Sequence, residues 1–185
     1  ISVKAWFVYL LSTGLMVFQH QTGWSWDFLL YSMNGKYLFA DGIFMEWLRP
    51  PLASFLLGIP QILVSRALAE IIFIITVSKL FLYAAYRVSE EYDLNFEYFY
   101  LLLMMPATIY YGTINGTEML SLAFAMLFLT ELDCERSGLW LGLAFLSRYT
   151  YGIFIPLVLI QRDIEKSVKT LLISAVPVSL WILFN

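Results

Sequence analysis

Long apolar runs separated by short polar breaks dominate this sequence of 185 residues. A helix needs ~20 predominantly apolar residues to cross the ~30 Å hydrocarbon core of a bilayer. The candidate spans are residues 1–18, 51–64, 67–88, 98–113, 119–132, 139–160 and the run from 170 onward. This pattern predicts an all-α fold, a polytopic membrane bundle of six or seven transmembrane helices in a single domain over residues 1–185.

The composition excludes several other classes of protein. Hydrophobic residues make up 61% of the chain and charged residues 14%, whereas a soluble domain is usually ~45–50% apolar and ~25% charged. A soluble enzyme and a disordered tail are therefore excluded, and a net charge of -3 offers no basic surface to nucleic acid. A single cysteine and a single histidine rule out a disulfide framework and a multi-histidine metal centre.

The connection between the first two runs, residues 19–50, is long and mixes aromatic with charged side chains. Such a composition predicts short amphipathic helices at the membrane surface, and long structured connections are often functional. If every run crosses the membrane, the loop lysines and arginines slightly favour a cytoplasmic N-terminus. The long connection and its chemistry then lie on the external or lumenal face.

Asp27 and Tyr31 are four positions apart in this connection, so on a helix they share one face. A partly desolvated carboxylate at a membrane surface is a candidate general base. The alternative is an interfacial helix cap or a solvated charge. The connection ends in Arg49-Pro50-Pro51-Leu52, where two prolines favour the start of a helix. Arg49 beside that helix N-terminus would suit a phosphate, or it snorkels to lipid headgroups.

Two further polar positions interrupt apolar runs. Glu118 follows a short polar break and either caps the next helix or acts as a second acid. Arg148 and Tyr149 stand in an otherwise apolar run, which we interpret as one helix. A charge inside a membrane helix is a candidate functional residue, facing a polar cavity unless it snorkels to a helix end.

Three other polar residues are expected to be structural. Glu70 and Lys79 fall on opposite faces of one helix and cannot pair with each other. Each is expected to pair with another segment or to lie near a helix end. His20, between two glutamines, is expected at the interface in a structural role.

The order of these features resembles the GT-C superfamily of membrane glycosyltransferases, in the branch of protein O-mannosyltransferases and lipid A aminoarabinose transferases. The similar motifs are Asp27-Phe28-Leu29-Leu30-Tyr31-Ser32-Met33-Asn34-Gly35, then Gly42, Arg49-Pro50-Pro51-Leu52, Val64-Ser65-Arg66-Ala67-Leu68, Pro106, Thr117-Glu118 and Gly142-Leu143-Ala144-Phe145-Leu146-Ser147-Arg148-Tyr149. Phe28 stands where the family has a second acid. The resemblance covers nearly the whole chain.

The resemblance implies a polyprenyl- or dolichyl-phosphate-linked sugar as donor. A base for the acceptor hydroxyl and a cation for the leaving phosphate are what such a transfer needs, and an inverting single displacement is the hypothesis that follows. The acceptor, a protein, lipid or glycan, stays open. The resemblance also implies Asp27 as the base that activates the acceptor, Arg49 as the group that holds the lipid phosphate, and Glu118 as a second acid. Tyr31, Arg148 and Tyr149 are the other candidate substrate-binding residues. A divalent metal remains an open cofactor. Glu118 can join Asp27 only if residues 51–64 do not cross the membrane.

The competing hypothesis is a non-enzymatic membrane protein, a transporter or a scaffold. A transporter typically contains interrupted helices in two halves, and the sequence displays no such pair. The chain starts with Ile1 and ends inside an apolar run, so we expect it to be the N-terminal part of a larger protein.

Overall fold

The computed structural model describes residues 2–23, 26–114, 116–161 and 164–184. These residues form helices and no β-strand, which confirms the all-α class. The elements are α1 (Val3–Thr22), α2 (Trp26–Phe39), α3 (Pro51–Gln61), α4 (Arg66–Glu91), α5 (Phe96–Leu103), α6 (Pro106–Ile114), α7 (Glu118–Thr130), α8 (Ser137–Ser147), the 3-10 helix η1 (Tyr149–Phe154), α9 (Ile155–Gln161) and α10 (Ile164–Phe184).

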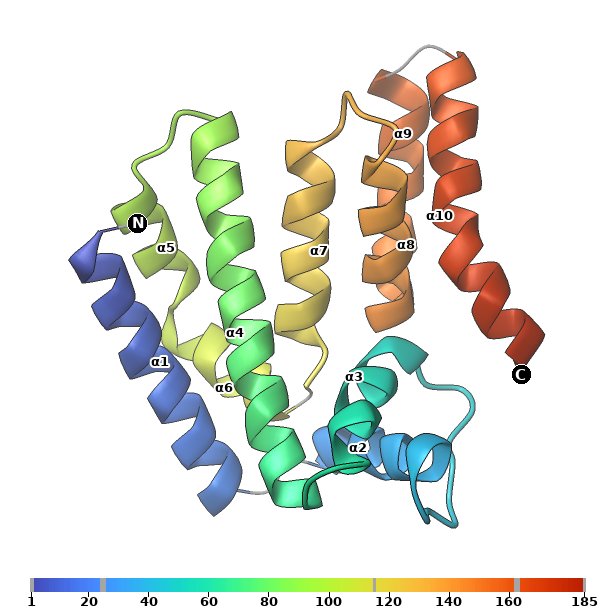
Figure 1. Cartoon of the computed structure of the whole chain (residues 1–185). Coiled ribbons are helices and arrows are strands. Elements are labelled where there is room, and N and C mark those ends of the chain that lie inside the picture. The colour runs from blue at the N-terminus through green and yellow to red at the C-terminus, as the bar shows by residue number, and fades with distance from the viewer. Residues whose placement is uncertain (1, 24–25, 115, 162–163, 185) are drawn as a thin grey trace.

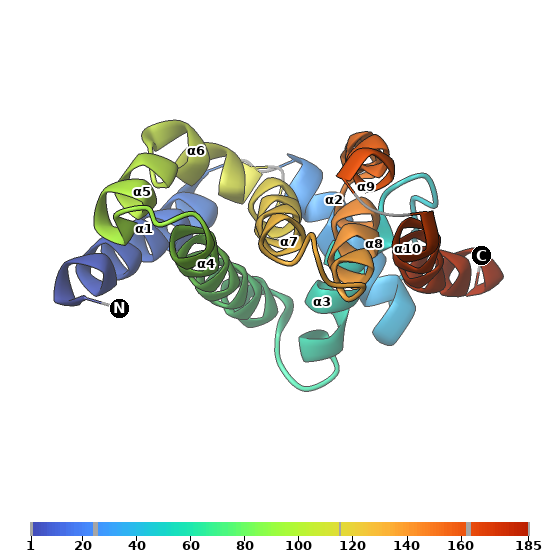
Figure 2. The same cartoon turned by 90° about the horizontal axis from the view of Figure 1, so that it is seen from above.

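The helices form a curved row rather than a round bundle. α1, α4, α7, α8 and α10 stand side by side in Figure 1, and the view from above shows α1 and α5 near one end of the row and α10 at the other (Figure 2). α7 packs between α4 and α8, and α8 packs in turn against α10. α2 and α3 pack on each other and lie across the lower end of the row in Figure 1.

The core is centred on α7, which is apolar on all sides. Leu120, Ala123 and Phe128 are fully buried, as expected of a helix with neighbours on both sides. By contrast α1 exposes Phe7, Leu10 and other large apolar side chains on its outer surface. In a membrane protein such a surface faces lipid.

The contact between α2 and α3 depends on two glycines. A Cβ atom on Gly35 would lie 2.7 Å from the Gly58 nitrogen, and one on Gly58 would lie 2.5 Å from the Gly35 carbonyl oxygen. The two backbones therefore touch directly. The loop between these helices is held by buried Asn34, whose Nδ2 donates to the Glu46 carbonyl and whose Oδ1 accepts from the Glu46 amide. This pairing fixes the approach of the chain to Arg49.

Within the described part of the chain, two helices are long and apolar enough to span a membrane, Arg66–Glu91 and Ile164–Leu183. The bundle of six or seven spans is therefore not confirmed. The expected span over 51–64 is the short α3, which lies across the end of the row (Figure 1). The run over 98–113 is divided into α5 and α6 just before Pro106, because proline disfavours a helical residue ahead of it.

Candidate active site

Asp27, Tyr31, Glu118, Arg148 and Tyr149 line a single pocket of about 230 Å³, which is completed by Pro50, Thr117 and Thr150. All of the predicted site residues except Arg49 therefore line the same pocket. The lining comes from α2, from the residue before α3, from the start of α7 and from the segment after α8. The ribbon of α2 lies across the lower ends of α7 and α8 (Figure 1).

The helix ends explain why these residues meet. Asp27 lies in the first turn of α2, with Tyr31 one turn later on the same face, as the four-residue spacing predicted. Glu118 is the first residue of α7, where an acid interacts favourably with the helix dipole. Since α3 does not run along the row, the start of α7 lies at the same end of the molecule as α2. Glu118 and Asp27 therefore line the same pocket.

Arg148 is not inside a helix, which corrects the interpretation of residues 139–160 as one continuous helix. α8 ends at Ser147, and Arg148 follows it in extended conformation, with φ -160° and ψ 115°. Its amide still donates to the Ala144 carbonyl at 2.9 Å. The 3-10 helix η1 then begins at Tyr149. The break turns the Arg148 side chain toward α7, where its Nη1 donates to Glu118 Oε1.

Arg49 lies behind the pocket and is held by two carboxylates. Its Nη2 donates to Asp27 Oδ1 at 3.0 Å and its Nε donates to Glu46 Oε2 at 2.7 Å. The guanidinium carbon also lies 5.2 Å from the centre of the Tyr31 ring, within the range of a cation–π contact. Glu46 was not among the predicted site residues, although its place three residues before Arg49 was a local signal for such a pair.

The surroundings of Arg49 shift two pKa values. Burial would lower the pKa of the Arg49 guanidinium, but hydrogen bonds to Glu46 and Asp27 outweigh it and the pKa is raised. Burial raises the pKa of the Tyr31 phenol, and hydrogen bonds to Arg49 and Thr117 offset only part of this rise. Arg49 is therefore a permanent cation and Tyr31 a neutral hydroxyl at physiological pH.

A larger pocket of about 640 Å³ adjoins the first one and shares Glu118, Arg148 and Thr150 with it. Its remaining lining is mostly apolar or aromatic, from Tyr111, Leu122, Tyr151, Ile153 and Phe154. The Glu118–Arg148 pair thus lines both pockets, the small one together with Asp27 and Tyr31 and the large one together with these apolar and aromatic residues.

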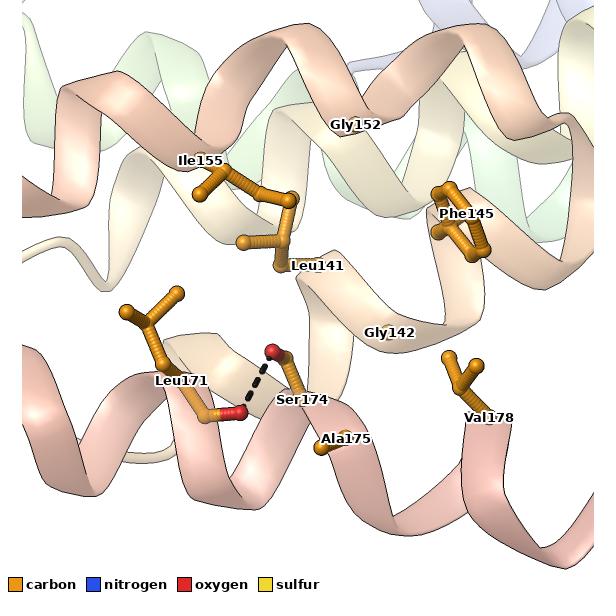
Figure 3. Close-up of a pocket in the computed structure, with 9 residues that line it drawn as sticks. All are labelled: Leu141, Gly142, Phe145, Gly152, Ile155, Leu171, Ser174, Ala175 and Val178. Atoms are coloured by element: carbon orange, nitrogen blue, oxygen red, sulfur yellow. Dashed lines mark hydrogen bonds between the residues drawn. The ribbon is translucent and has the colours of Figure 1, made fainter.

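A third pocket, of about 290 Å³, lies between α8, the η1–α9 segment and α10 (Figure 3). Figure 3 shows apolar side chains such as Leu141, Phe145 and Val178 around it, and the Ser174 hydroxyl donates to the Leu171 carbonyl at 2.8 Å. Because this hydroxyl already bonds to its own helix, the pocket offers no group for acid or base chemistry.

The described residues do not fit a divalent metal. They contain no group of three or more His, Cys, Asp or Glu side chains able to hold an ion. Each pocket carboxylate instead contacts a guanidinium, Asp27 that of Arg49 and Glu118 that of Arg148. A cation next to each acid opposes the approach of a second positive charge. Phe28, in place of the second acid of the family motif, is fully buried away from the solvent.

The chain matches no known family model, no curated protein and no solved structure. Its function must therefore be argued from the residues of the pocket and from their surroundings.

Proposed function

We propose that this protein is a membrane glycosyltransferase that moves a sugar from a polyprenyl- or dolichyl-phosphate donor to an acceptor hydroxyl, as the resemblance to the GT-C superfamily implies. The observation that carries the proposal is that the Glu118–Arg148 pair lines both a small pocket, which also contains Asp27 and Tyr31, and a larger pocket whose other residues are mostly apolar or aromatic. An isoprenoid phosphate sugar has the same division, a polar head on an apolar chain.

In this reaction Asp27 takes the proton of the acceptor hydroxyl. The acceptor oxygen attacks the anomeric carbon, the bond from that carbon to the phosphate oxygen breaks, and the lipid phosphate leaves with the negative charge. Asp27 suits the role of base because Arg49 engages its Oδ1 and orients the carboxylate, while the side chain stays partly exposed to the pocket. General base catalysis and a cation at the leaving phosphate are the two demands of such a transfer.

We assign the lipid phosphate to Arg148 rather than to Arg49. The Arg148 side chain is 42% exposed and lines both pockets. The Arg49 side chain is 19% exposed and already bonds to Asp27 and Glu46. A guanidinium has five N–H donors, so the contact with Glu118 leaves Arg148 with donors for a phosphate. In this scheme Arg49 orients the base, and Glu118 orients Arg148.

The proposal includes a multi-pass membrane protein with the pocket at the external or lumenal surface. The loop between α2 and α3 supports this placement, because Ile43 and Leu48 are almost fully exposed there. Trp47 of the same loop stacks on Trp181 of α10, with ring centroids 6.4 Å apart. Exposed apolar side chains beside an aromatic pair at the end of a candidate span are typical of the membrane interface.

The experiment that tests the proposal is a transfer assay on the full-length protein in membranes, with a panel of polyprenyl-phosphate sugars. Photo-crosslinking with an isoprenoid phosphate carrying a diazirine on the chain would locate the lipid. We expect labels on residues of η1 and on Tyr111 or Leu122. Absence of both transfer and labelling by well-folded protein would overturn the proposal.

One observation favours a transporter as the second candidate. The apolar run over 98–113 is interrupted between α5 and α6, and the run over 139–160 is interrupted at Arg148. Paired interrupted helices are characteristic of secondary transporters. Solute uptake by proteoliposomes separates the two functions, since a transporter would accumulate solute without breaking a glycosidic bond. For a transporter, neither wild type nor Asp27→Asn would transfer sugar.

A further inference from the structure

A buried ionic cluster lies beside the pocket but outside it. His20, in the last turn of α1, contacts Glu70 Oε2 through its Nε2 at 3.0 Å. Arg66 Nε donates to the other carboxylate oxygen of Glu70 at 2.8 Å. The side chains of His20 and Glu70 are only 7% and 9% exposed. The cluster joins the end of α1 to the start of α4.

The cluster reaches the pocket through Phe28, which is fully buried. The His20 ring lies 4.3 Å from the Phe28 ring, and Phe73 of α4 packs edge-on against the other side at 5.6 Å. A Cβ atom on Gly116 would lie 2.7 Å from Phe28 Cδ2. Phe28 is therefore enclosed by α1, by α4 and by the turn that precedes Glu118.

Two different faces of α2 therefore make contacts, one toward the ionic cluster and the other toward the pocket. Phe28 and Ser32, four residues apart, face the ionic cluster, and the buried Ser32 hydroxyl lies beside the Glu70 carboxylate although without hydrogen-bond geometry. Asp27 and Tyr31 face the pocket. A movement of Phe28 would shift Asp27 on α2 and would also disturb the turn before Glu118.

A buried pair that includes a charged group contributes little net stability compared with apolar residues of the same size, but the loss of one partner leaves that charge uncompensated. Its best-supported use is to fix one arrangement of elements among several. His20 and Glu70 are 50 positions apart in the chain and come from different helices, so their pairing selects one register of α1 against α4.

We propose that His20 is a positioning residue for the sugar transfer, a role that rests on the proposed function. Through Glu70 and Phe28 it fixes α2 and the Gly116 turn in the register at which Asp27 faces the Glu118–Arg148 pair. His20 contacts no residue of the pocket lining in this scheme and acts only through α2.

The test compares wild type with His20→Ala, His20→Gln and Glu70→Gln in full-length protein in nanodiscs. Gln19→Ala is the matched control, because Gln19 precedes His20 on α1 and, among the described hydrogen bonds, its side chain donates to the Tyr110 carbonyl and not to Glu70. The readouts are backbone hydrogen exchange over α2 and residues 116–118, the stoichiometry of donor binding, and the kcat and donor KM of transfer.

We expect His20→Ala to speed exchange in α2 and at 116–118 but not in α10. We expect kcat per bound donor to fall by roughly 10- to 100-fold, because a displacement of about 1 Å at a reacting group costs about 100-fold in rate. The donor KM should change less than kcat, since Arg148 lies on another element and is reached only through Glu118. His20→Gln keeps a donor near Glu70 and should recover part of kcat.

Exchange that rises equally in every helix would show a merely structural role and would overturn the proposal. So would wild-type exchange and wild-type kcat in both His20 variants. If wild type transfers no sugar, the proposed function fails while exchange in α2 still decides whether His20 holds that helix. If His20→Ala does not fold, His20→Gln and Glu70→Gln provide the same comparison.

Discussion

Arg148 and Glu118 form an ion pair between residues 30 positions apart, and it joins the break after α8 to the first residue of α7. Both residues line the small pocket that contains Asp27 and the larger pocket beside it. The position of the pair assigns a different task to each of the two arginines near the site, and this difference can be measured.

Exchanging the two arginines for glutamine should separate binding from chemistry. We expect Arg148→Gln to raise the donor KM by roughly 10-fold or more, because a hydrogen bond to a charged group contributes about 1.5–3 kcal/mol. Arg49→Gln should mainly lower kcat, because it releases Asp27 from its hydrogen bond. Steady-state kinetics with a varied concentration of polyprenyl-phosphate sugar would test the assignment. The reverse pattern would return the phosphate to Arg49.

Asp27→Asn should lower kcat by roughly 100- to 10,000-fold, the usual contribution of a general base. Asp41→Asn is the control, because Asp41 is an exposed acid in the same connection that pairs only with Lys36 among the described contacts. Thermal unfolding of both variants should match wild type. An Asp27→Asn variant that folds and retains full turnover would remove Asp27 from the mechanism.

Chelation of divalent metal should leave the transfer rate unchanged. Each pocket carboxylate already contacts a guanidinium, and these cations supply the positive charge that a metal would provide at a leaving phosphate. The measurement is turnover after dialysis against EDTA, followed by readdition of Mg²⁺ or Mn²⁺. Loss of activity that the added metal restores would contradict this prediction.

Gly116→Ala should destabilise the fold by about 1–3 kcal/mol, since Gly116 has φ +77° and a left-handed backbone strains other residues. The new Cβ would also press on the Phe28 ring. Gly14→Ala is the matched control in α1, where nothing lies within 4 Å of an added Cβ. There we expect a gain of about 0.5–1 kcal/mol. Thermal unfolding in detergent would give both values, and equal effects would contradict the account.

Tyr31 should make the fold sensitive to alkali. Its pKa is raised, chiefly by burial, so the unfolded chain loses this proton at a lower pH than the folded chain. The contribution to stability is therefore fully present below the ordinary tyrosine pKa and is lost as the pH rises through the folded value. Tyr31→Phe should reduce this loss and remove one late step from the tyrosinate absorbance titration. Tyr37→Phe, at an exposed position, is the control, and identical titration curves for the two variants would refute the prediction.

Several local features could be predicted from the residues alone. The spacing of Asp27 and Tyr31 predicted a shared helix face, and α2 has it. The Pro-Pro motif predicted the start of a helix, and α3 begins at Pro51. Each of these depends on interactions within one or two helical turns, which neighbouring residues determine directly. The long apolar runs likewise predicted the all-α class.

Other features depended on contacts between distant segments. The sequence interpretation placed Arg148 inside a helix, because an apolar run on both sides of a charge carries no sign of a break. It also left open whether residues 51–64 cross the membrane. The position of α3 follows from the backbone contact of Gly35 with Gly58. Two glycines 23 positions apart carry no sequence signal that they are in contact.

The sequence by itself determined that this chain is helical and apolar, that Asp27 and Tyr31 share a helix face and that a helix starts after Arg49, because propensity and spacing act over a few residues. Only the tertiary structure decided which of the polar side chains meet: Arg49 with Asp27, Arg148 with Glu118, and His20 with Glu70. The last of these pairs spans 50 positions of the chain. The physical reason is that such pairings are selected by the packing of whole helices, which no local pattern encodes.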